Sequence, residues 1–244
     1  GDRLRKKHIY EIGYLPEERG LYKKMKVGEQ ALYLAQLKGM KKHEAVERLK
    51  EWFIKFGIQE WWDRKVEELS KGMQQKVQFI VTILHRPSLL IFDEPFSGFD
   101  PINANLLKQE ILKLKQEGST IIFSTHNMAS VEEICDNITL INNARKMLEG
   151  PIDDIKEEYK SNIFEVGLRS GDDNLKEKLS QDFNLLDFYE ANKHLVAKIK
   201  LKQGESTNGL VERILQHSTM ISFKEVIPSL NDIFIKVVEE KNAN

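Results

Sequence analysis

The sequence predicts an α/β fold built on a parallel sheet with covering helices, followed by a small C-terminal α+β module. Residues 89–92 (LLIF) and 120–123 (TIIF) are short apolar runs, which are typical of strands buried on both faces of a sheet. Between them, after Pro101, apolar residues recur at helical spacing up to Gly118. A strand, a helix and a second strand within about thirty residues form a βαβ unit, so the two strands are expected to run parallel.

The segment before this unit is mainly helical in its periodicity. Residues 27–56 predict two helices, which end at Gly39 and Gly57. Residues 9–15 (IYEIGYL) predict a short strand that Pro16 stops. A helical subdomain at about residues 25–65 is therefore expected beside the sheet.

Two further elements flank the βαβ unit. An apolar stripe over residues 77–84 predicts a helix that Pro87 closes. Residues 138–150 (ITLINNARKMLEG) predict a hairpin with Asn142-Asn143 at its turn.

The C-terminal residues follow a different pattern. Four short strands alternate with two helices in the order βαββαβ, which predicts an α+β module of the split-βαβ kind. The expected strands are residues 163–169, 184–190, 195–201 and 221–226. We expect a domain at residues 1–150 and an accessory domain at residues 151–244, with the boundary between Gly150 and Ser161.

Composition excludes several classes of function. Apolar residues make up 41% of the chain and charged residues 31%, a balance typical of globular domains. The formal net charge of −1 argues against a protein that binds nucleic acid by bulk electrostatics. A single cysteine, Cys135, excludes an internal disulfide and is expected to be buried at a helix end. No apolar stretch approaches the ~20 residues of a membrane span, and no signal peptide is evident, so we expect a cytosolic protein.

Asp93 and Glu94 carry the strongest chemical signal. They directly follow a buried strand, so they lie at the carboxyl edge of the predicted sheet, where open α/β sheets bind ligands. Two adjacent carboxylates repel each other unless a cation compensates, and Mg²⁺ with a bound phosphate supplies one. Asp93 is then placed to serve the metal and Glu94 to deprotonate an attacking water. A solvated pair at a strand end is the alternative.

Three more segments join this pair. LSKGMQQ (69–75) opens the apolar helix, with Ser70 as its N-cap and Gly72 allowing close backbone approach, and free N–H groups at a helix start attract anions. SGFDP (97–101) presents Asp100 before the next helix, and His126 follows the second buried strand. Taken singly, Ser70 is explained as a cap and His126 as a structural histidine. Their joint order and spacing favour a nucleotide site.

These four segments resemble the signature, Walker B, D-loop and switch-histidine motifs of ATP-binding-cassette (ABC) ATPases. The resemblance covers residues 9–150 and implies a P-loop NTPase-type parallel sheet. The run IGYLPEERGLYKKMKVGEQ (12–30) is similar to the Q-loop region of the sodium-efflux and drug-export branch. The ending VIPSLNDIFIKVVEE (226–240) is similar to the C-terminal end of that branch.

The resemblance implies roles for the matched residues and the partners they act with. Ser70, Gly72 and Gln74 of the signature would contact an ATP held mainly by a second ATPase subunit, in a head-to-tail homodimer or pair. Asp93 and the Q-loop residue Glu17 would hold Mg²⁺, Glu94 would be the general base, and His126 would hold the γ-phosphate. Asp100 would link the two sites. ATP hydrolysis would drive a separate membrane permease, contacted through residues 25–65, with the ATPase on the inner face of the membrane and no nucleic acid involved.

The sequence departs from the family pattern at three matched positions. Lys71 and Met73 stand where the commonest signature has glycine and glutamine, and Glu17 stands where the Q-loop has glutamine. A carboxylate still offers oxygen to Mg²⁺ but loses the donor of the amide. We expect these changes to tune the site without inactivating it.

The chain also contains no GxxxxGK[ST] phosphate-binding loop. Without it there is no cradle of backbone N–H groups and no phosphate lysine. We expect an ATPase domain that lacks its N-terminal Walker A part, with the sheet incomplete at that end, and a chain that is inactive alone. The alternatives are a non-catalytic partner that donates only its signature half-site, and the related ATPases of DNA repair or translation. The latter usually carry coiled-coil inserts or duplicated cassettes, and neither pattern occurs in this sequence.

Overall fold

The structure is a computed structural model that describes residues 3, 5–18, 20–169, 174–191, 194–202 and 204–242. It divides into two compact units, Gly1–Ile134 and Cys135–Asn244, and we describe each unit by itself. Among the described residues no helix has both the length and the apolar character needed to cross a membrane.

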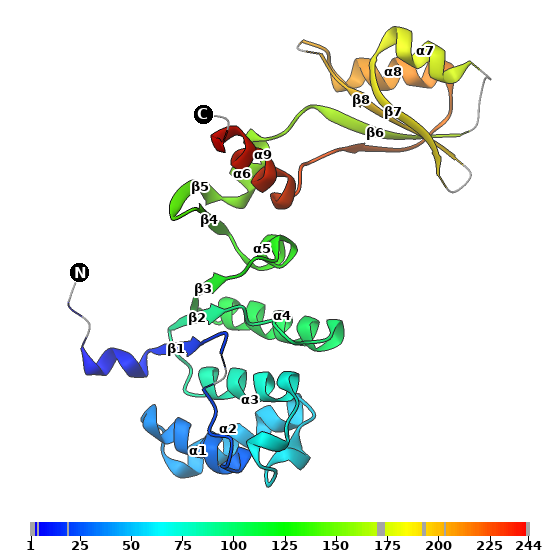
Figure 1. The fold of residues 1–244 in the computed structure, drawn as a ribbon. Helices are drawn as coiled ribbons and strands as arrows, with labels where there is room; N and C mark the ends of the chain where they lie inside the picture. The colour runs from blue at the N-terminus through cyan, green and yellow to red at the C-terminus, as the bar shows by residue number, and fades with distance from the viewer. Residues whose placement is uncertain are drawn as a thin grey trace. The chain divides into compact units, whose positions relative to one another are not determined.

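A three-stranded parallel sheet organises the first unit (Figure 1). Its strands β1 (Ile12–Leu15), β2 (Leu89–Asp93) and β3 (Thr120–Ser124) lie in that order. Leu15 pairs with Phe92, and Phe92 pairs with Phe123, so the strands end at the same level. The predicted βαβ unit and its parallel strands are therefore confirmed, and all three carboxyl ends meet at one edge.

The helices of this unit follow the predicted order. They are α1 (Val27–Leu37), α2 (Lys42–Lys55), α3 (Lys71–Ile83), α4 (Pro101–Gln116) and α5 (Met128–Ile134), with short 3-10 helices η1 (Lys6–Tyr10), η2 (Gln59–Trp61) and η3 (Val66–Glu68). The predicted strand at residues 9–15 was too long, because η1 occupies its first residues and β1 begins only at Ile12.

One face of the sheet packs tightly against α3. Leu15, Leu90 and Phe92 are fully buried on this face, and the Phe92 ring lies 5.8 Å from the ring of Phe79 on α3. A Cβ at Gly13 would lie only 2.6 Å from the Thr82 carbonyl oxygen, so this close approach of helix and strand requires glycine. The apolar stripe of α3 therefore builds the core, as its periodicity predicted.

The opposite face of the sheet carries an apolar row that the described residues leave partly open. The register aligns Tyr14 with Ile91 and Ile91 with Ile122, so the three side chains share a face. Tyr14 and Ile122 are each 54% exposed. We call this row the open sheet face.

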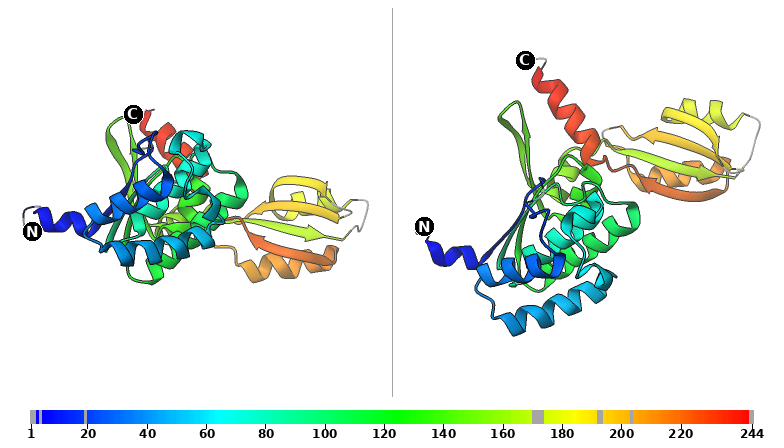
Figure 2. Two further views of the ribbon diagram at one scale, coloured as in Figure 1. Left: turned by 90° about the horizontal axis from the view of Figure 1, so that it is seen from below. Right: turned by 60° about the horizontal axis from the view of Figure 1, so that its bottom comes forward.

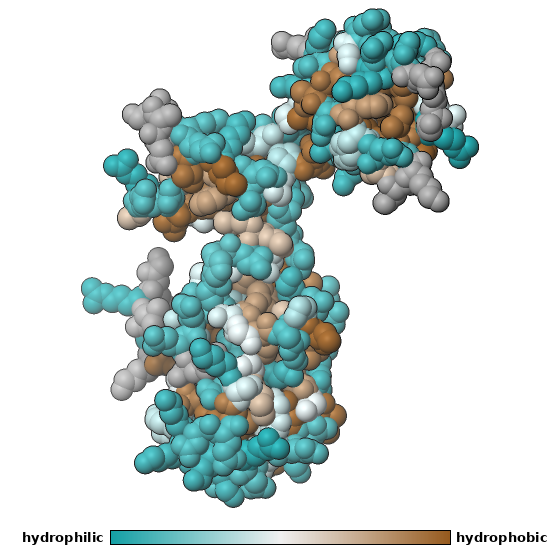
Figure 3. All heavy atoms as spheres, turned by 45° about the vertical axis from the view of Figure 1, so that its right-hand side comes forward, coloured by the Kyte–Doolittle hydropathy of each residue, from teal (hydrophilic) through white to brown (hydrophobic). Residues whose placement is uncertain are grey.

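The helical region, α1 and α2 with the loop up to α3, is joined by polar contacts to helix α4 and to the end of helix α3. Lys55 on α2 pairs with the buried Glu110 on α4 at 2.5 Å, and Arg48 donates to the Leu84 carbonyl at 2.9 Å. Its outer surface is largely hydrophilic in Figure 3. The Trp62 ring packs 5.4 Å from Phe53, inside this region.

The second unit begins with the predicted hairpin. Strands β4 (Asn137–Asn142) and β5 (Arg145–Pro151) pair antiparallel, and α6 (Ile152–Glu158) follows them. The turn lies one residue later than predicted, because Asn142 still pairs with Arg145 and the two positive-φ residues are Asn143 (φ 48°) and Ala144 (φ 56°). Cys135 is only half-buried, so the expectation of a buried thiol was wrong. It lies just beyond the end of α5, outside the apolar positions of that helix.

The rest of the second unit has the predicted βαββαβ order. Its elements are β6 (Ile163–Leu168), α7 (Leu175–Asp182), β7 (Asn184–Ala191), β8 (His194–Lys200), α8 (Thr207–His217) and β9 (Met220–Glu225), with α9 (Leu230–Asn242) after them. The antiparallel sheet has the order β7-β8-β6-β9, so β8 lies between β6 and β7, as a split-βαβ module requires. Helices α7 and α8 lie beside the strands of this module in Figure 2. Their residues Leu179 and Ile214 are buried in one apolar cluster with alternate residues of the strands. The expected domain division near Gly150–Ser161 stays a prediction.

Candidate active site at the carboxyl edge of the parallel sheet

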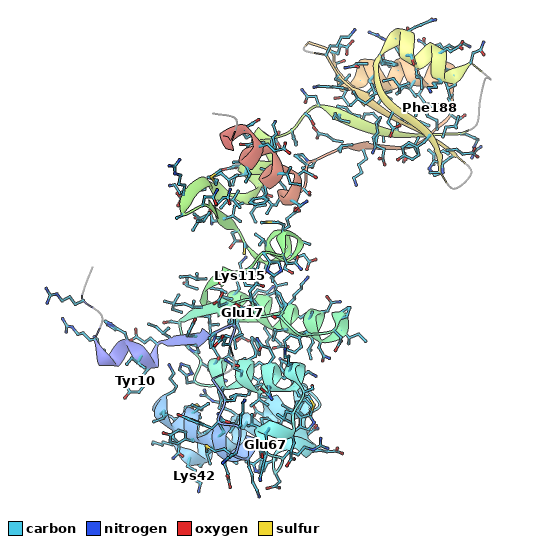
Figure 4. All side chains as sticks on the ribbon, viewed as in Figure 1. Tyr10, Glu17, Lys42, Glu67, Lys115 and Phe188 are labelled. Carbon is cyan, nitrogen blue, oxygen red and sulfur yellow. The ribbon has the colours of Figure 1, made fainter. Side chains whose placement is uncertain are left out.

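The carboxyl edge of the parallel sheet brings three predicted site residues together. Asp93 ends β2, Glu94 follows it, and His126 lies just beyond the end of β3. Glu17 lies in the stretch after β1, next to the sheet in Figure 4, with an exposed side chain. Parallel register places these strand ends side by side, as expected for the binding edge of an open α/β sheet.

The end of β3 holds the two acids of β2. Ser124 Oγ donates to Asp93 Oδ1 at 2.6 Å, and Thr125 Oγ1 donates to Glu94 Oε2 at 2.9 Å. The His126 backbone N–H donates to Glu94 Oε1 at 2.8 Å, and His126 Nδ1 lies 2.6 Å from the same oxygen. Every donor comes from residues 124–126, so one short segment orients both carboxylates.

Glu94 is set apart by its backbone and its burial. Its φ of 42° lies in the left-handed region, which is rare for a residue with a side chain and is often found at functional sites. Its side chain is 18% exposed, whereas that of His126 is 91% exposed. The carboxylate is therefore held in place, while the exposed imidazole has room to turn from Glu94 toward a ligand.

The signature segment starts α3 and lies against the loop that follows Glu94. Ser70 caps the helix, accepting from the Met73 N–H at 3.3 Å, as its sequence position predicted. A Cβ at Gly72 would lie 3.0 Å from the Gly98 carbonyl oxygen, so glycine allows the two segments to approach closely. The structure therefore brings the signature and the D-loop turn into contact within one chain.

Two glutamines after the signature glycine have structural contacts. Gln74 Nε2 donates to the carbonyls of Leu69 (2.9 Å) and Val66 (3.3 Å), which anchors its amide inside the chain. Gln75 is buried and donates to the Pro95 carbonyl at 3.5 Å, directly after Glu94. The structure shows no approach of the Gln74 side chain to the acid pair.

Asp100 caps α4. Its Oδ1 accepts from the backbone N–H groups of Asn103 and Ile102 at 3.0 Å each. Hydrogen bonds from the Asn103 backbone and side chain lower the pKa of Asp100, because they favour the charged carboxylate. Burial lowers the pKa of the nearby Lys76 amine, and the negative charge of Asp100 partly opposes that shift.

Sequence reasoning missed three contributors to this edge: Ser124, Thr125 and Gln75. The adjacency of Ser124 and Thr125 to His126 was the available signal, because strand partners of an acid pair lie within hydrogen-bond reach. Gln75 could not be found from sequence, since its role depends on how α3 meets the loop at Pro95.

The carboxylates at this edge fit a nucleotide-bound Mg²⁺ better than a metal held by protein alone. Asp93 and Glu17 supply hard oxygen donors, which Mg²⁺ prefers, and Mg²⁺ usually takes one or two carboxylates with substrate phosphates and water. The described residues contain no group of three or more His, Cys, Asp or Glu side chains placed to hold a metal ion.

Comparisons with known proteins agree with these motifs. The family profile described as "ABC transporter" matches residues 2–97, and one described as "ATP-binding protein DrrA1-3-like, C-terminal domain" matches residues 150–238. The uncharacterized ABC transporter ATP-binding protein YhaQ of Bacillus subtilis is 42% identical over 228 residues, covering 93% of this chain and 74% of the relative. The uncharacterized ABC transporter ATP-binding protein BpOF4_11395 of Alkalihalophilus pseudofirmus is 37% identical over 250 residues, covering 98% and 87%.

A solved structure supports the same family as these profiles and relatives. The structure of an ATP-binding subunit of an ABC transporter superposes with a TM-score of 0.57 at 32% identity, covering 62% of each chain. The acids at the carboxyl edge and the helix that begins with the signature agree with a relative that this chain covers over most of its length. The chain therefore belongs to the ATP-binding proteins of ABC transporters.

Proposed function

We propose that this chain supplies the hydrolytic half of an ATP site in an ABC exporter of the sodium-efflux and drug-export branch. The observation that carries the proposal is the acid pair Asp93–Glu94, held at the sheet edge by residues 124–126. The match of residues 150–238 to a DrrA-like C-terminal domain supports the choice of branch. Two ATPase subunits would pair head to tail and drive a separate permease at the inner face of the membrane, without nucleic acid.

Each residue of the site takes one role in this proposal. Asp93 and Glu17 would hold Mg²⁺, which neutralises charge on the phosphates when bound. Glu94 accepts a proton from the attacking water, and His126 turns its exposed imidazole from Glu94 toward the γ-phosphate.

The signature residues act on the nucleotide of the paired subunit. Ser70 and Gly72 lie at the start of α3, and the first N–H groups of a helix lack intrahelical partners and favour phosphate binding. Gln74 is proposed as their neighbour in this contact, although its amide nitrogen is already engaged by backbone carbonyls. Asp100, on the D-loop turn that touches Gly72 through Gly98, links the two sites.

The open sheet face supports a further part of the proposal. Parallel sheets occur almost only with both faces covered, yet Tyr14 and Ile122 are each 54% exposed here. We propose that a segment carrying the GxxxxGK[ST] loop covers this row in the active protein, since the 244 residues contain no such loop. The 244-residue chain by itself is then expected to show no ATP turnover.

The test is ATP turnover by a subunit that includes this phosphate-binding segment, reconstituted with its permease. Glu94→Gln should abolish turnover because the amide cannot accept the proton, while Glu117→Gln, on an exposed helix end, should leave it unchanged. Full activity of the Glu94→Gln variant would show that Glu94 is not the base.

A second candidate function is a non-catalytic partner that donates only its signature half-site. The start of α3 favours it, because Ser70 and Gly72 are in place without any phosphate loop in the chain. Calorimetry of the 244-residue chain should then detect no ATP binding, while addition of a complete subunit restores nucleotide binding that Ser70→Ala weakens.

A further inference from the structure

The segment after β3 contains a hydroxyl that none of the matched motifs explains. Thr125 lies between Ser124, which holds Asp93, and His126, which contacts Glu94. We propose that Thr125 is a positioning residue for the Glu94 carboxylate, fixing one of its oxygens so that the other is presented to water. This inference rests on the proposed role of Glu94 as the base.

The direction of the hydrogen bonds at Thr125 is fixed by its neighbours. The Asn127 backbone N–H donates to Thr125 Oγ1 at 3.1 Å, so the hydroxyl oxygen accepts from that side. Thr125 Oγ1 lies 2.9 Å from Glu94 Oε2, and a carboxylate oxygen accepts. The single hydroxyl proton of Thr125 therefore points at Glu94. The two hydrogen bonds form a series in which Asn127 donates to Thr125 and Thr125 donates to Glu94.

Asn127 is itself anchored, which makes Thr125 a rigid support. Its side-chain Oδ1 accepts from the Ser130 N–H at 3.1 Å, at the start of α5. Thr125 is half-buried and directly follows the last residue of β3. The hydroxyl is thus held between a strand end and a helix start, and it cannot follow a ligand as an exposed side chain does.

The two oxygens of Glu94 have different partners. Oε2 accepts a hydrogen bond from the Thr125 hydroxyl. Oε1 accepts one from the His126 backbone N–H and also contacts the Nδ1 of His126. When the exposed imidazole turns away, Oε1 loses one partner while Oε2 keeps its own. Thr125 therefore keeps the carboxylate from rotating at the moment when Oε1 becomes available to the attacking water.

The backbone of Glu94 increases the need for such a support. Its left-handed φ of 42° is a conformation that side-chain-bearing residues rarely keep without surrounding contacts. Misplacement of a reacting group by about 1 Å can cost on the order of a hundredfold in rate. Loss of the Thr125 hydroxyl should accordingly lower turnover and leave nucleotide affinity unchanged.

The experiment compares Thr125→Val and Thr125→Ser in a subunit with its phosphate-binding segment and permease, using ATP turnover at varied ATP. Thr125→Val keeps the shape and removes the hydroxyl, so kcat should fall about ten- to a hundredfold with KM for ATP within about twofold. Thr125→Ser should restore kcat to within about threefold. Thr120→Val, the same change at the start of β3, is the matched control and should match the unsubstituted protein.

The outcomes separate this inference from the proposed function. Unchanged kcat in Thr125→Val, or no recovery in Thr125→Ser, overturns the role of Thr125 while Glu94→Gln remains inactive. Activity in Glu94→Gln instead removes the base assignment on which the inference rests.

Thermal melting of the 244-residue chain gives a second measurement if Thr125→Val expresses poorly in the complex. Thr125→Val should lower Tm in the presence of Glu94 and have a clearly smaller effect in a Glu94→Ala background, because the hydroxyl then has no carboxylate to bind. Equal shifts in the two backgrounds would show that Thr125 and Glu94 are not coupled.

Discussion

His85, just beyond α3, is a side chain of the described part of the chain whose ionisation the fold changes strongly. Burial lowers its pKa to about 4, and the nearby charges of Lys38 and Arg48 act in the same direction. The contact of Nε2 with the Ile12 carbonyl, 3.3 Å away, opposes the shift only partly. Lys38 also donates to the Ile12 carbonyl at 2.9 Å, so the start of β1 is fastened by two basic side chains.

This shift predicts that the free energy of unfolding decreases as the pH is lowered through a defined window. An unfolded histidine takes up a proton near pH 6.5, whereas folded His85 does so only near pH 4. Between these values the unfolded chain binds more protons, so the free energy of unfolding decreases as pH falls. Allowing for the solvent that reaches this half-buried ring, we expect a loss on the order of 1 kcal/mol between pH 7 and pH 5.

Urea unfolding at pH 7 and pH 5 measures this loss. His85→Gln should reduce the difference between the two pH values, while His43→Gln, on the exposed start of α2, should keep it. An equal pH dependence in His85→Gln and the unsubstituted chain would refute the assignment to His85.

At the scale of elements, the β4–β5 hairpin shows how one residue of register changes a prediction. Two asparagines marked a turn, and the pairing of Asn142 with Arg145 moves the turn to Asn143 and Ala144. A two-residue turn of this hand needs positive φ at both positions, which asparagine tolerates well and alanine does not. Strand pairing, which sequence does not display, decided the position.

Ala144→Gly should therefore stabilise the protein. Glycine adopts the left-handed conformation without the steric cost that alanine carries, so we expect a gain of about 0.5–1 kcal/mol and a rise in Tm of a few degrees. Ala104→Gly is the control with the opposite expected sign. Ala104 lies within helix α4, where glycine is less favourable than alanine, so this change should lower Tm by a similar amount. Calorimetry or circular dichroism reads both, and a lower Tm in Ala144→Gly would contradict the strain at this turn.

At the scale of the whole molecule, the two units have separate cores. The second unit buries its own apolar cluster, with Val166, Leu168 and Leu179 almost fully enclosed between strands and helices. The first unit depends on α3 against the sheet and leaves the open sheet face uncovered by the described residues. We therefore expect the first unit to be less stable on its own than the second unit.

Residues 135–244 should fold when expressed alone, because their core is complete without the parallel sheet. Far-ultraviolet circular dichroism should show a mixed α/β spectrum with a single cooperative thermal transition. Residues 1–134 alone should bind more of a hydrophobic dye than residues 135–244, since the row of Tyr14 and Ile122 is exposed. A broad, non-cooperative transition for residues 135–244 would count against an independent second unit.

Much of the fold follows from local patterns in the sequence. Periodicity predicted α1 to α4, continuous apolar runs predicted β2 and β3, and alternation predicted the βαββαβ module. The positions of Asp93, Glu94 and His126 followed from the ends of those strands, because parallel topology sends all carboxyl ends to one edge. The 3-10 helix before β1 and the half-exposure of Cys135 did not follow, because both depend on neighbours distant in sequence.

By itself, then, the sequence determined the acid pair, the helix cap Ser70 and the family to which the motifs belong. Spacing along one chain was enough, because these residues are placed by elements whose local signals are strong. Only the tertiary structure decided that Thr125 and His126 share the two oxygens of Glu94, and that Gly72 touches Gly98. Hydrogen bonds of this kind depend on atoms meeting within about 3 Å across elements, and no pattern along the chain carries that information.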